Sequence, residues 1–162
     1  MDGLLGRPAT VLALIALLCF GSVGLALVSQ YQFDMQPCPW CTFQRLIFLV
    51  IGSFAVLGLL MWSSGIRRVV ALGGLMLAVC GMASALWQYF VAAKSDSCNL
   101  TLADRIMQSL GLYDHAPQVF APMASCAEAS ITLVGIPYAF WSLFVFLLVA
   151  LGCVQVMRVT RI

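Results

Sequence analysis

The chain has 162 residues, of which 63% are apolar and 9% are charged, with a formal net charge of +2. Soluble domains carry about 25% charged residues, so this composition excludes an ordinary soluble domain. Its high hydrophobicity excludes intrinsic disorder. The small net charge forms no basic stripe, which argues against nucleic-acid binding.

Four charge-free stretches divide the chain, at 8–33, 46–66, 69–93 and 129–157. A helix of about 20 apolar residues crosses the hydrocarbon core of a bilayer, and each stretch is long enough. Their apolar runs are continuous, whereas barrel strands would alternate, so helices are favoured. We therefore predict an all-α membrane protein, a four-transmembrane-helix bundle that forms a single integral membrane domain over 1–162. The predicted spans are about 11–29, 46–64, 69–92 and 138–157.

The distribution of basic residues predicts the orientation, because Lys and Arg concentrate in cytoplasmic loops. With four spans, both termini and the loop at 65–68 share one side, which carries five of the eight basic residues. That side is predicted to be cytoplasmic. The loops at about 30–45 and 94–137 then face outward.

The long outward loop contains two helical patterns. In 99–111 apolar residues recur at helical spacing, with Thr101 and Asp104 as capping residues. In 125–135 a Ser and a Glu have capping-box spacing, and the apolar residues that follow suit a helix lying in the membrane interface. Those apolar residues are Ile131, Leu133 and Val134.

Between the two patterns, the proline-containing stretch 114–124 is predicted to be irregular. Its lone His115 is interpreted as a solvated loop residue and is given no ligand role.

The seven cysteines divide by location. Three lie within apolar spans, where free cysteine packs as a small hydrophobe, so we assign no chemistry to Cys19, Cys80 and Cys153. The other four lie in the two outward loops, in the compartment where disulfides persist. They are Cys38, Cys41, Cys98 and Cys126.

Three interpretations of these four outward cysteines compete. Two structural disulfides are one. A zinc site is another, although its usual form needs two short Cys-x-x-Cys arms and the chain supplies one. Redox catalysis is the third, because a Cys-x-x-Cys disulfide closes a very short loop and stabilises the fold little. This argument favours electron transfer at Cys38 and Cys41.

The residues around Cys41 suit thiolate chemistry. Pro39 fits the first turn of a helix, so both sulfurs would lie near a helix N-terminus, whose partial positive charge stabilises a thiolate. Arg45 follows Cys41 by four residues and shares its helix face. A cation there stabilises a thiolate and can polarise a carbonyl acceptor. Alternatively, Arg45 extends to lipid headgroups.

At these residues the chain resembles the disulfide bond formation protein B (DsbB) family, bacterial inner-membrane proteins that reoxidise the periplasmic thiol oxidase DsbA. The resemblance rests on the four spans, PCPWCTFQR at 37–45, a lone loop cysteine, PQVF at 117–120 and CAE at 126–128. Gly135 and Pro137 before the last span also fit. Vitamin K epoxide reductase-like proteins share the architecture, but there the loop pair precedes the Cys-x-x-Cys. Gln44 stands where some family members carry an acidic residue.

The resemblance implies an electron relay. Cys98 and Cys126 would form the outer disulfide, which accepts electrons from a DsbA-like thioredoxin-fold partner, with Cys98 in the mixed disulfide. Cys38 and Cys41 would form the inner disulfide beside a bound quinone, either ubiquinone or menaquinone, and Cys41 would act on the quinone ring. Arg45 would bind a quinone carbonyl oxygen and stabilise its negative charge. Thiolate attack on a disulfide sulfur accounts for each protein step, and the quinone carries the two-electron chemistry.

The implied function is that of a quinone-dependent protein disulfide oxidoreductase in the bacterial inner membrane, with both termini cytoplasmic, its redox loops periplasmic and no metal. Two alternatives remain open at this point. One is a vitamin K epoxide reductase-like or paralogous oxidase with a dedicated substrate. The other is a membrane protein with two inert structural disulfides.

Overall fold

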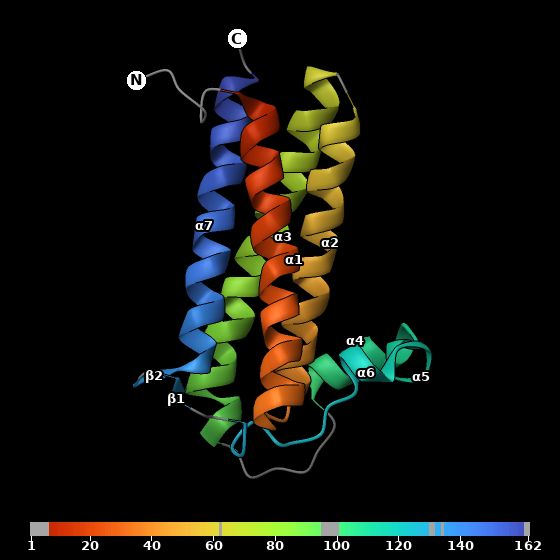
Figure 1. Ribbon diagram of the computed structural model, residues 1–162, viewed down its shortest axis with the longest axis vertical. Helices are drawn as coiled ribbons and strands as arrows, with labels where there is room; N and C mark the ends of the chain where they lie inside the picture. The colour runs from red at the N-terminus through yellow and green to blue at the C-terminus, as the bar shows by residue number, and fades with distance from the viewer. Residues whose placement is uncertain (1–6, 62, 95–100, 130–131, 134, 161–162) are drawn as a thin grey trace.

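The computed structural model describes residues 7–61, 63–94, 101–129, 132–133 and 135–160. In this part of the chain four long helices form an up-and-down bundle, and the first begins at the same end at which the last one finishes (Figure 1). They are α1 (Pro8–Phe33), α2 (Pro39–Leu60), α3 (Ser64–Phe90) and α7 (Tyr138–Val159). Each is long and apolar enough to cross a membrane. The prediction of an all-α, four-helix membrane protein is confirmed.

The four helices pack in a ring, in which α1 contacts α2 and α7, and α3 contacts the same two helices. Small residues permit the closest approaches, as they do in other membrane bundles. A Cβ atom added to Gly81 of α3 would overlap the Phe146 ring of α7. That ring stacks on Phe48 of α2, with ring centroids 4.0 Å apart. Gly81 therefore makes room for an aromatic pair at the centre of the bundle.

The outer faces of the bundle are apolar, as a lipid-facing surface requires. Leu25 of α1 and Val69 of α3, for example, are each 70% exposed. Cys80 lies on this outer face, whereas Cys19 and Cys153 are buried in the core. The core positions agree with the predicted packing role of these two cysteines.

The chain between α3 and α7 emerges at the end of the bundle that carries Cys38, which we call the cysteine end. It contains η2 (Ala92–Lys94) and three short helices, α4 (Leu102–Ser109), α5 (Leu112–His115) and α6 (Pro117–Phe120). Helices α4 to α6 form an arm that projects sideways from the bundle (Figure 1).

Helix α4 confirms the predicted helical pattern in 99–111. Its N-terminus carries the full capping box: the Thr101 hydroxyl accepts from the Asp104 backbone N–H at 3.2 Å, and the Thr101 N–H donates to the Asp104 carboxylate at 2.9 Å. Local chemistry alone was sufficient to predict this helix.

The prediction that 114–124 is irregular is wrong, because this stretch contains the end of α5 and all of α6. Pro117 occupies the first turn of α6, where a missing N–H has no effect on the helix. Gly111 precedes α5 with φ at +65°, a conformation that glycine adopts without strain.

The prediction of a helix over 125–135 is also wrong, because the described residues of this stretch are not helical. Ser125 and Glu128 make the expected reciprocal hydrogen bonds, but the chain forms only a turn over 126–129. It then forms a hairpin of β1 (Thr132–Leu133) and β2 (Ile136–Pro137), in which Thr132 pairs with Pro137 and Leu133 with Ile136. Gly135, with φ at +79°, reverses the chain. Ile131 and Val134, placed on the same predicted helix, lie outside the described residues.

Candidate active site

Helix α2 begins between the two cysteines of the Cys-x-x-Cys motif. Pro39 is its first residue, as expected, and Cys38 is its N-cap, with a sulfur that accepts a hydrogen bond from the Cys41 backbone N–H at 3.3 Å. The Thr42 hydroxyl donates to the Pro39 carbonyl oxygen at 2.9 Å and further fixes this first turn. Both sulfurs therefore lie at the positive end of the helix dipole.

The long loop brings a third cysteine to this helix end. The Cys38 thiol makes side-chain hydrogen bonds with both Cys41 and Cys126. Backbone hydrogen bonds hold the loop in place, because the N–H groups of Met123 and Ala124 donate to the Pro37 carbonyl oxygen at 2.9 and 3.3 Å. Cys38 and Cys126 share a small buried apolar cluster with Trp40, Ala92 and Ala103. The structure thus brings residues from the two loops predicted to face outward together at one point.

Cys38 and Cys126, whose thiols are in contact, have pKa values shifted in opposite directions by their surroundings. Burial raises the pKa of Cys38, and the hydrogen bonds that its thiol shares with Cys126 and Cys41 raise it further. The hydrogen bond from Cys38 lowers the pKa of Cys126. Cys126 therefore forms a thiolate more readily than Cys38 does.

Cys98, predicted to pair with Cys126 as the outer disulfide, lies outside the described residues. The other three predicted redox cysteines, Cys38, Cys41 and Cys126, are free thiols in the structure. Their contacts place Cys38 between the other two.

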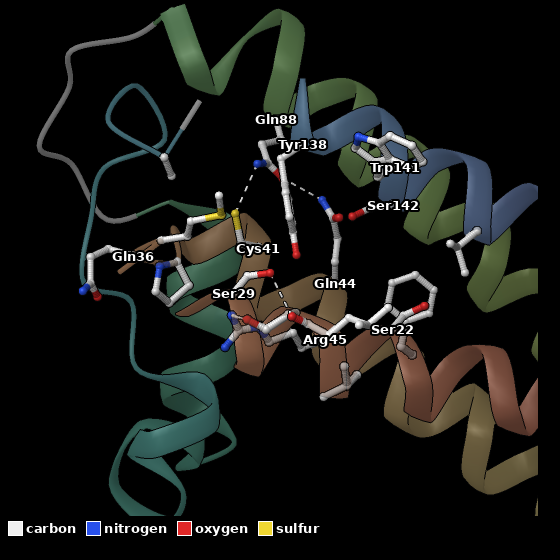
Figure 2. Close-up of a pocket in the computed structure, with 18 residues that line it drawn as sticks. Ser22, Ser29, Gln36, Cys41, Gln44, Arg45, Gln88, Tyr138, Trp141 and Ser142 are labelled. Carbon is white, nitrogen blue, oxygen red and sulfur yellow. Dashed lines mark hydrogen bonds between the residues drawn. The ribbon is translucent and has the colours of Figure 1, made fainter. Parts of the chain in front are cut away.

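Two buried glutamines form a hydrogen-bonded chain that ends at the Cys41 sulfur, and sequence analysis assigned a role to neither. Gln88 of α3 donates from its Nε2 to the Cys41 sulfur at 3.2 Å, and its Oε1 accepts from Gln44 Nε2 at 2.7 Å (Figure 2). The signal that could have identified Gln88 is its place in a charge-free span, because polar residues inside a membrane are seldom there without a function.

A cavity of about 290 Å³ adjoins Cys41 at the cysteine end, between all four long helices. Its walls are mostly apolar, with a few convergent polar groups, which is the composition of small-molecule sites. Aromatic residues on α2 and α7 contribute flat surfaces: Phe48, Tyr138 and Trp141. Polar residues from all four helices line the cavity, among them Cys41, Gln44, Arg45 and Gln88. Figure 2 shows the side chains of Cys41, Gln44 and Gln88 directed toward one another.

Arg45 lies inside the bundle, with only 6% of its surface exposed. Its Nη1 donates to Gln30 Oε1 at 2.7 Å and to the Val119 carbonyl oxygen at 2.9 Å, and its Nη2 approaches the Ala26 carbonyl oxygen at 3.4 Å. These partners exclude the alternative in which Arg45 extends to lipid headgroups. They also tie α1 and α6 to the start of α2.

The three hydrogen bonds do not use every donor of Arg45. A guanidinium group has five N–H donors, and the buried Nε has no hydrogen-bond partner among the described residues. A buried donor without a partner costs about 1–3 kcal/mol, so its presence calls for an acceptor that a ligand would supply. Because Arg45 lines the cavity, a molecule bound there would be in a position to provide that acceptor. A carbonyl oxygen fits this requirement.

The fold and the site together define a multi-pass membrane protein with thiols clustered at one end of a four-helix bundle, beside a ligand-sized cavity. Comparison with known proteins agrees. The family model described as "Disulfide bond formation protein DsbB" matches residues 8–156. No solved structure matches the chain.

Curated relatives carry the same description. Disulfide bond formation protein B of Cupriavidus metallidurans is 32% identical over 148 residues, covering 88% of this chain and 88% of the relative. Disulfide bond formation protein B 1 of Pseudomonas syringae pv. syringae is 33% identical over 90% of this chain and 87% of its own length. Disulfide bond formation protein B of Ralstonia nicotianae is 33% identical over 89% and 90%. The chain belongs to the DsbB family, and it is a disulfide-forming oxidoreductase by that membership.

Proposed function

We propose that this protein is a quinone-dependent disulfide oxidoreductase that reoxidises a DsbA-like periplasmic dithiol protein. The observation that carries the proposal is a shared cavity: the Cys41 sulfur and the unpartnered Nε donor of Arg45 belong to residues that line the same cavity. An electron donor and a carbonyl-binding cation thus border one ligand-sized space.

The lining of the cavity fits a quinone head group. Phe48, Tyr138 and Trp141 offer flat apolar surfaces to a ring, while Arg45, Gln44 and Gln88 offer N–H donors to its two carbonyl oxygens. A quinone bound there would accept two electrons and two protons and leave as a quinol. The apolar outer faces of α1 and α7 suit a cofactor that arrives from the membrane.

The thiol contacts support a direction of electron flow. The reduced partner would open the Cys98–Cys126 disulfide by attack at Cys98, which leaves Cys126 as a thiolate. That thiolate would attack the Cys38 sulfur in the Cys38–Cys41 disulfide, so that a Cys38–Cys126 bond forms and Cys41 is released as a thiolate. The contact of Cys126 with Cys38, and the lowered pKa of Cys126, both favour this step. The second thiolate of the partner would displace Cys98, which leaves the partner oxidised. The Cys98 thiolate would then attack Cys126, which restores the Cys98–Cys126 disulfide and leaves Cys38 and Cys41 as the reduced pair.

Three groups would stabilise the thiolate that Cys41 then carries. The N-terminus of α2 contributes its dipole, Gln88 donates a hydrogen bond, and Arg45 contributes a positive charge that its uncharged hydrogen-bond partners do not neutralise. The free Nε–H of Arg45 would donate to a carbonyl oxygen as that oxygen becomes negative, and such preorganised donors lower reaction barriers.

The proposed setting is the bacterial inner membrane, with 1–162 as one integral membrane domain. Both termini would be cytoplasmic and the cysteine end periplasmic. This orientation follows from the bias of basic residues. It places Cys38, Cys41, Cys98 and Cys126 in the compartment where disulfides persist.

Turnover by the purified protein tests the proposal. The protein is supplied with a soluble ubiquinone analogue and a reduced DsbA-like protein, and loss of quinone is followed by ultraviolet absorbance. Cys41→Ser should abolish turnover, whereas Cys80→Ser, on the outer face of the bundle, should turn over at the parent rate. Turnover of Cys41→Ser at the parent rate would refute the proposal. If the disulfides of the oxidised protein resist a mild dithiol reductant, they are structural and inert, and the protein is not a redox enzyme.

A further inference from the structure

The hydrogen bonds of the buried Gln44–Gln88 pair run in one direction, from Gln44 to Gln88 and from Gln88 to the Cys41 sulfur. We infer that Gln88 is a catalytic hydrogen-bond donor to the Cys41 sulfur, and that Gln44 is a positioning residue that holds the Gln88 amide in the donating orientation. The inference rests on the proposed function in one respect, namely that Cys41 works as a thiolate.

The geometry supplies a chain of two hydrogen bonds. Gln44 Nε2 donates to Gln88 Oε1 at 2.7 Å, and Gln88 Nε2 donates to the Cys41 sulfur at 3.2 Å. Both glutamines are nearly fully buried, at 3% and 5% exposure, so water does not replace either bond at low cost. Figure 2 shows the two amides and the sulfur in sequence at the edge of the cavity.

The direction of the amides decides which protonation state of Cys41 is favoured. An amide has one acceptor end and one donor end, and a thiolate only accepts. If the Gln88 amide turned over while Gln44 stayed, two N–H groups would face each other and the Gln88 oxygen would face the sulfur. The bond from Gln44 therefore opposes the orientation that would repel a thiolate.

Gln88 and Arg45 make different contributions at Cys41. Arg45 contributes charge, which acts over several ångströms and in no particular direction. Gln88 contributes a directed, uncharged donor in contact with the reacting atom. Because no described hydrogen bond links Gln44 to Cys41 itself, Gln44 should affect the sulfur only through Gln88.

A double-mutant cycle on thiol reactivity tests whether Gln44 acts on Cys41 only through Gln88. The variants are Gln44→Met, Gln88→Met and the double variant, because methionine matches glutamine in length and has no N–H donor. The reduced proteins are treated with iodoacetamide without quinone or partner, and alkylation of each cysteine is read by mass spectrometry. Thiolate, not thiol, is the form that reacts. Gln108→Met, on the exposed face of α4, is the matched control.

Gln88→Met should slow alkylation of Cys41 about tenfold, the equivalent of about 1.4 kcal/mol. Gln44→Met should slow alkylation of Cys41 about threefold, the equivalent of roughly 0.7 kcal/mol, because the Gln88 amide can then turn. The double variant should match Gln88→Met alone. Alkylation of Cys126 should stay at the parent rate in all variants, which verifies that the cysteine end is folded.

Two results would overturn the inference. One is Cys41 reactivity at the parent rate in folded Gln88→Met protein. The other is a double variant about thirtyfold slower than the parent, the product of the two single effects, which would mean that Gln44 acts independently of Gln88. If Gln88→Met does not fold, Gln88→Leu replaces it in the cycle. Since the assay contains no quinone, its outcome is separate from the turnover test of the proposed function.

Discussion

Replacement of Arg45 by lysine is the sharpest perturbation of the cavity, because it keeps the positive charge and removes the Nε–H donor. In the structure that donor is buried without a partner, while Nη1 and Nη2 are engaged by Gln30, Val119 and Ala26. A lysine ammonium is a compact point charge without the planar fork of arginine. We therefore expect Arg45→Lys to weaken the contact to a ligand carbonyl oxygen more than it weakens the electrostatic field at Cys41.

The size of the effect follows from the kind of bond that is lost. A hydrogen bond to a charged group contributes about 1.5–3 kcal/mol, which corresponds to a fall of roughly 10- to 150-fold in kcat/KM for quinone. Gln30→Met serves as the matched control, because it removes one acceptor of Arg45 and leaves the Nε donor in place. It should lower kcat/KM for quinone less than threefold.

The assay measures initial rates of quinone loss at several quinone concentrations, with the reduced partner in excess. Thermal unfolding in detergent verifies that each variant is folded. Parental kcat/KM in folded Arg45→Lys protein would show that the Nε donor does not contact the quinone. An equal loss in Gln30→Met would instead mean that Arg45 acts by fastening α1 and α6 to α2.

Three further predictions concern the thiols and the bundle. In oxidised Cys41→Ser protein, peptide mapping should find Cys38 bonded to Cys126, because their thiols are in contact; a map without this bond would contradict the relay. As pH is raised from acid, alkylation of Cys126 in the reduced protein should begin before that of Cys38, since the hydrogen bond from Cys38 lowers the pKa of Cys126 and burial raises that of Cys38; the opposite order would disprove this assignment. Gly81→Ala should destabilise the bundle by about 1–3 kcal/mol, because the new Cβ would overlap the Phe146 ring. Gly21→Ala, where a new Cβ has nothing within 4 Å, should leave the melting temperature unchanged. Equal melting temperatures for the two variants would contradict the described packing.

Local chemistry was sufficient to predict much of the fold. The charge-free stretches locate the four long helices because charged groups are costly in lipid, and this cost applies wherever the span packs. Pro39 predicts where α2 begins, and Thr101 with Asp104 predicts where α4 begins, since each signal acts within one helical turn. The sequence also separates Cys38, Cys41 and Cys126, which lie at the cysteine end or in the long loop, from Cys19, Cys80 and Cys153, which lie within the long helices.

The rest depends on contacts between distant parts of the chain. The Cys38–Cys126 contact is fixed by backbone hydrogen bonds from Met123 and Ala124 to Pro37, and no local pattern encodes such bonds. The amide of Gln88 reaches Cys41 only because α3 packs on α2. The hairpin at β1 and β2 replaced a predicted helix because the reversal at Gly135 outweighed the capping signal at Ser125.

The central claim is that Cys41 delivers electrons to a quinone in the cavity between the four helices. The most direct measurement mixes fully reduced protein with a soluble ubiquinone analogue under anaerobic conditions, without partner. Quinol and free thiols are counted after a rapid quench. The account predicts that quinol appears as thiols are lost, one quinol for each pair of thiols, and that Cys41→Ser produces none. Quinol formation by Cys41→Ser at the parent rate, or loss of thiols without quinol, would contradict it.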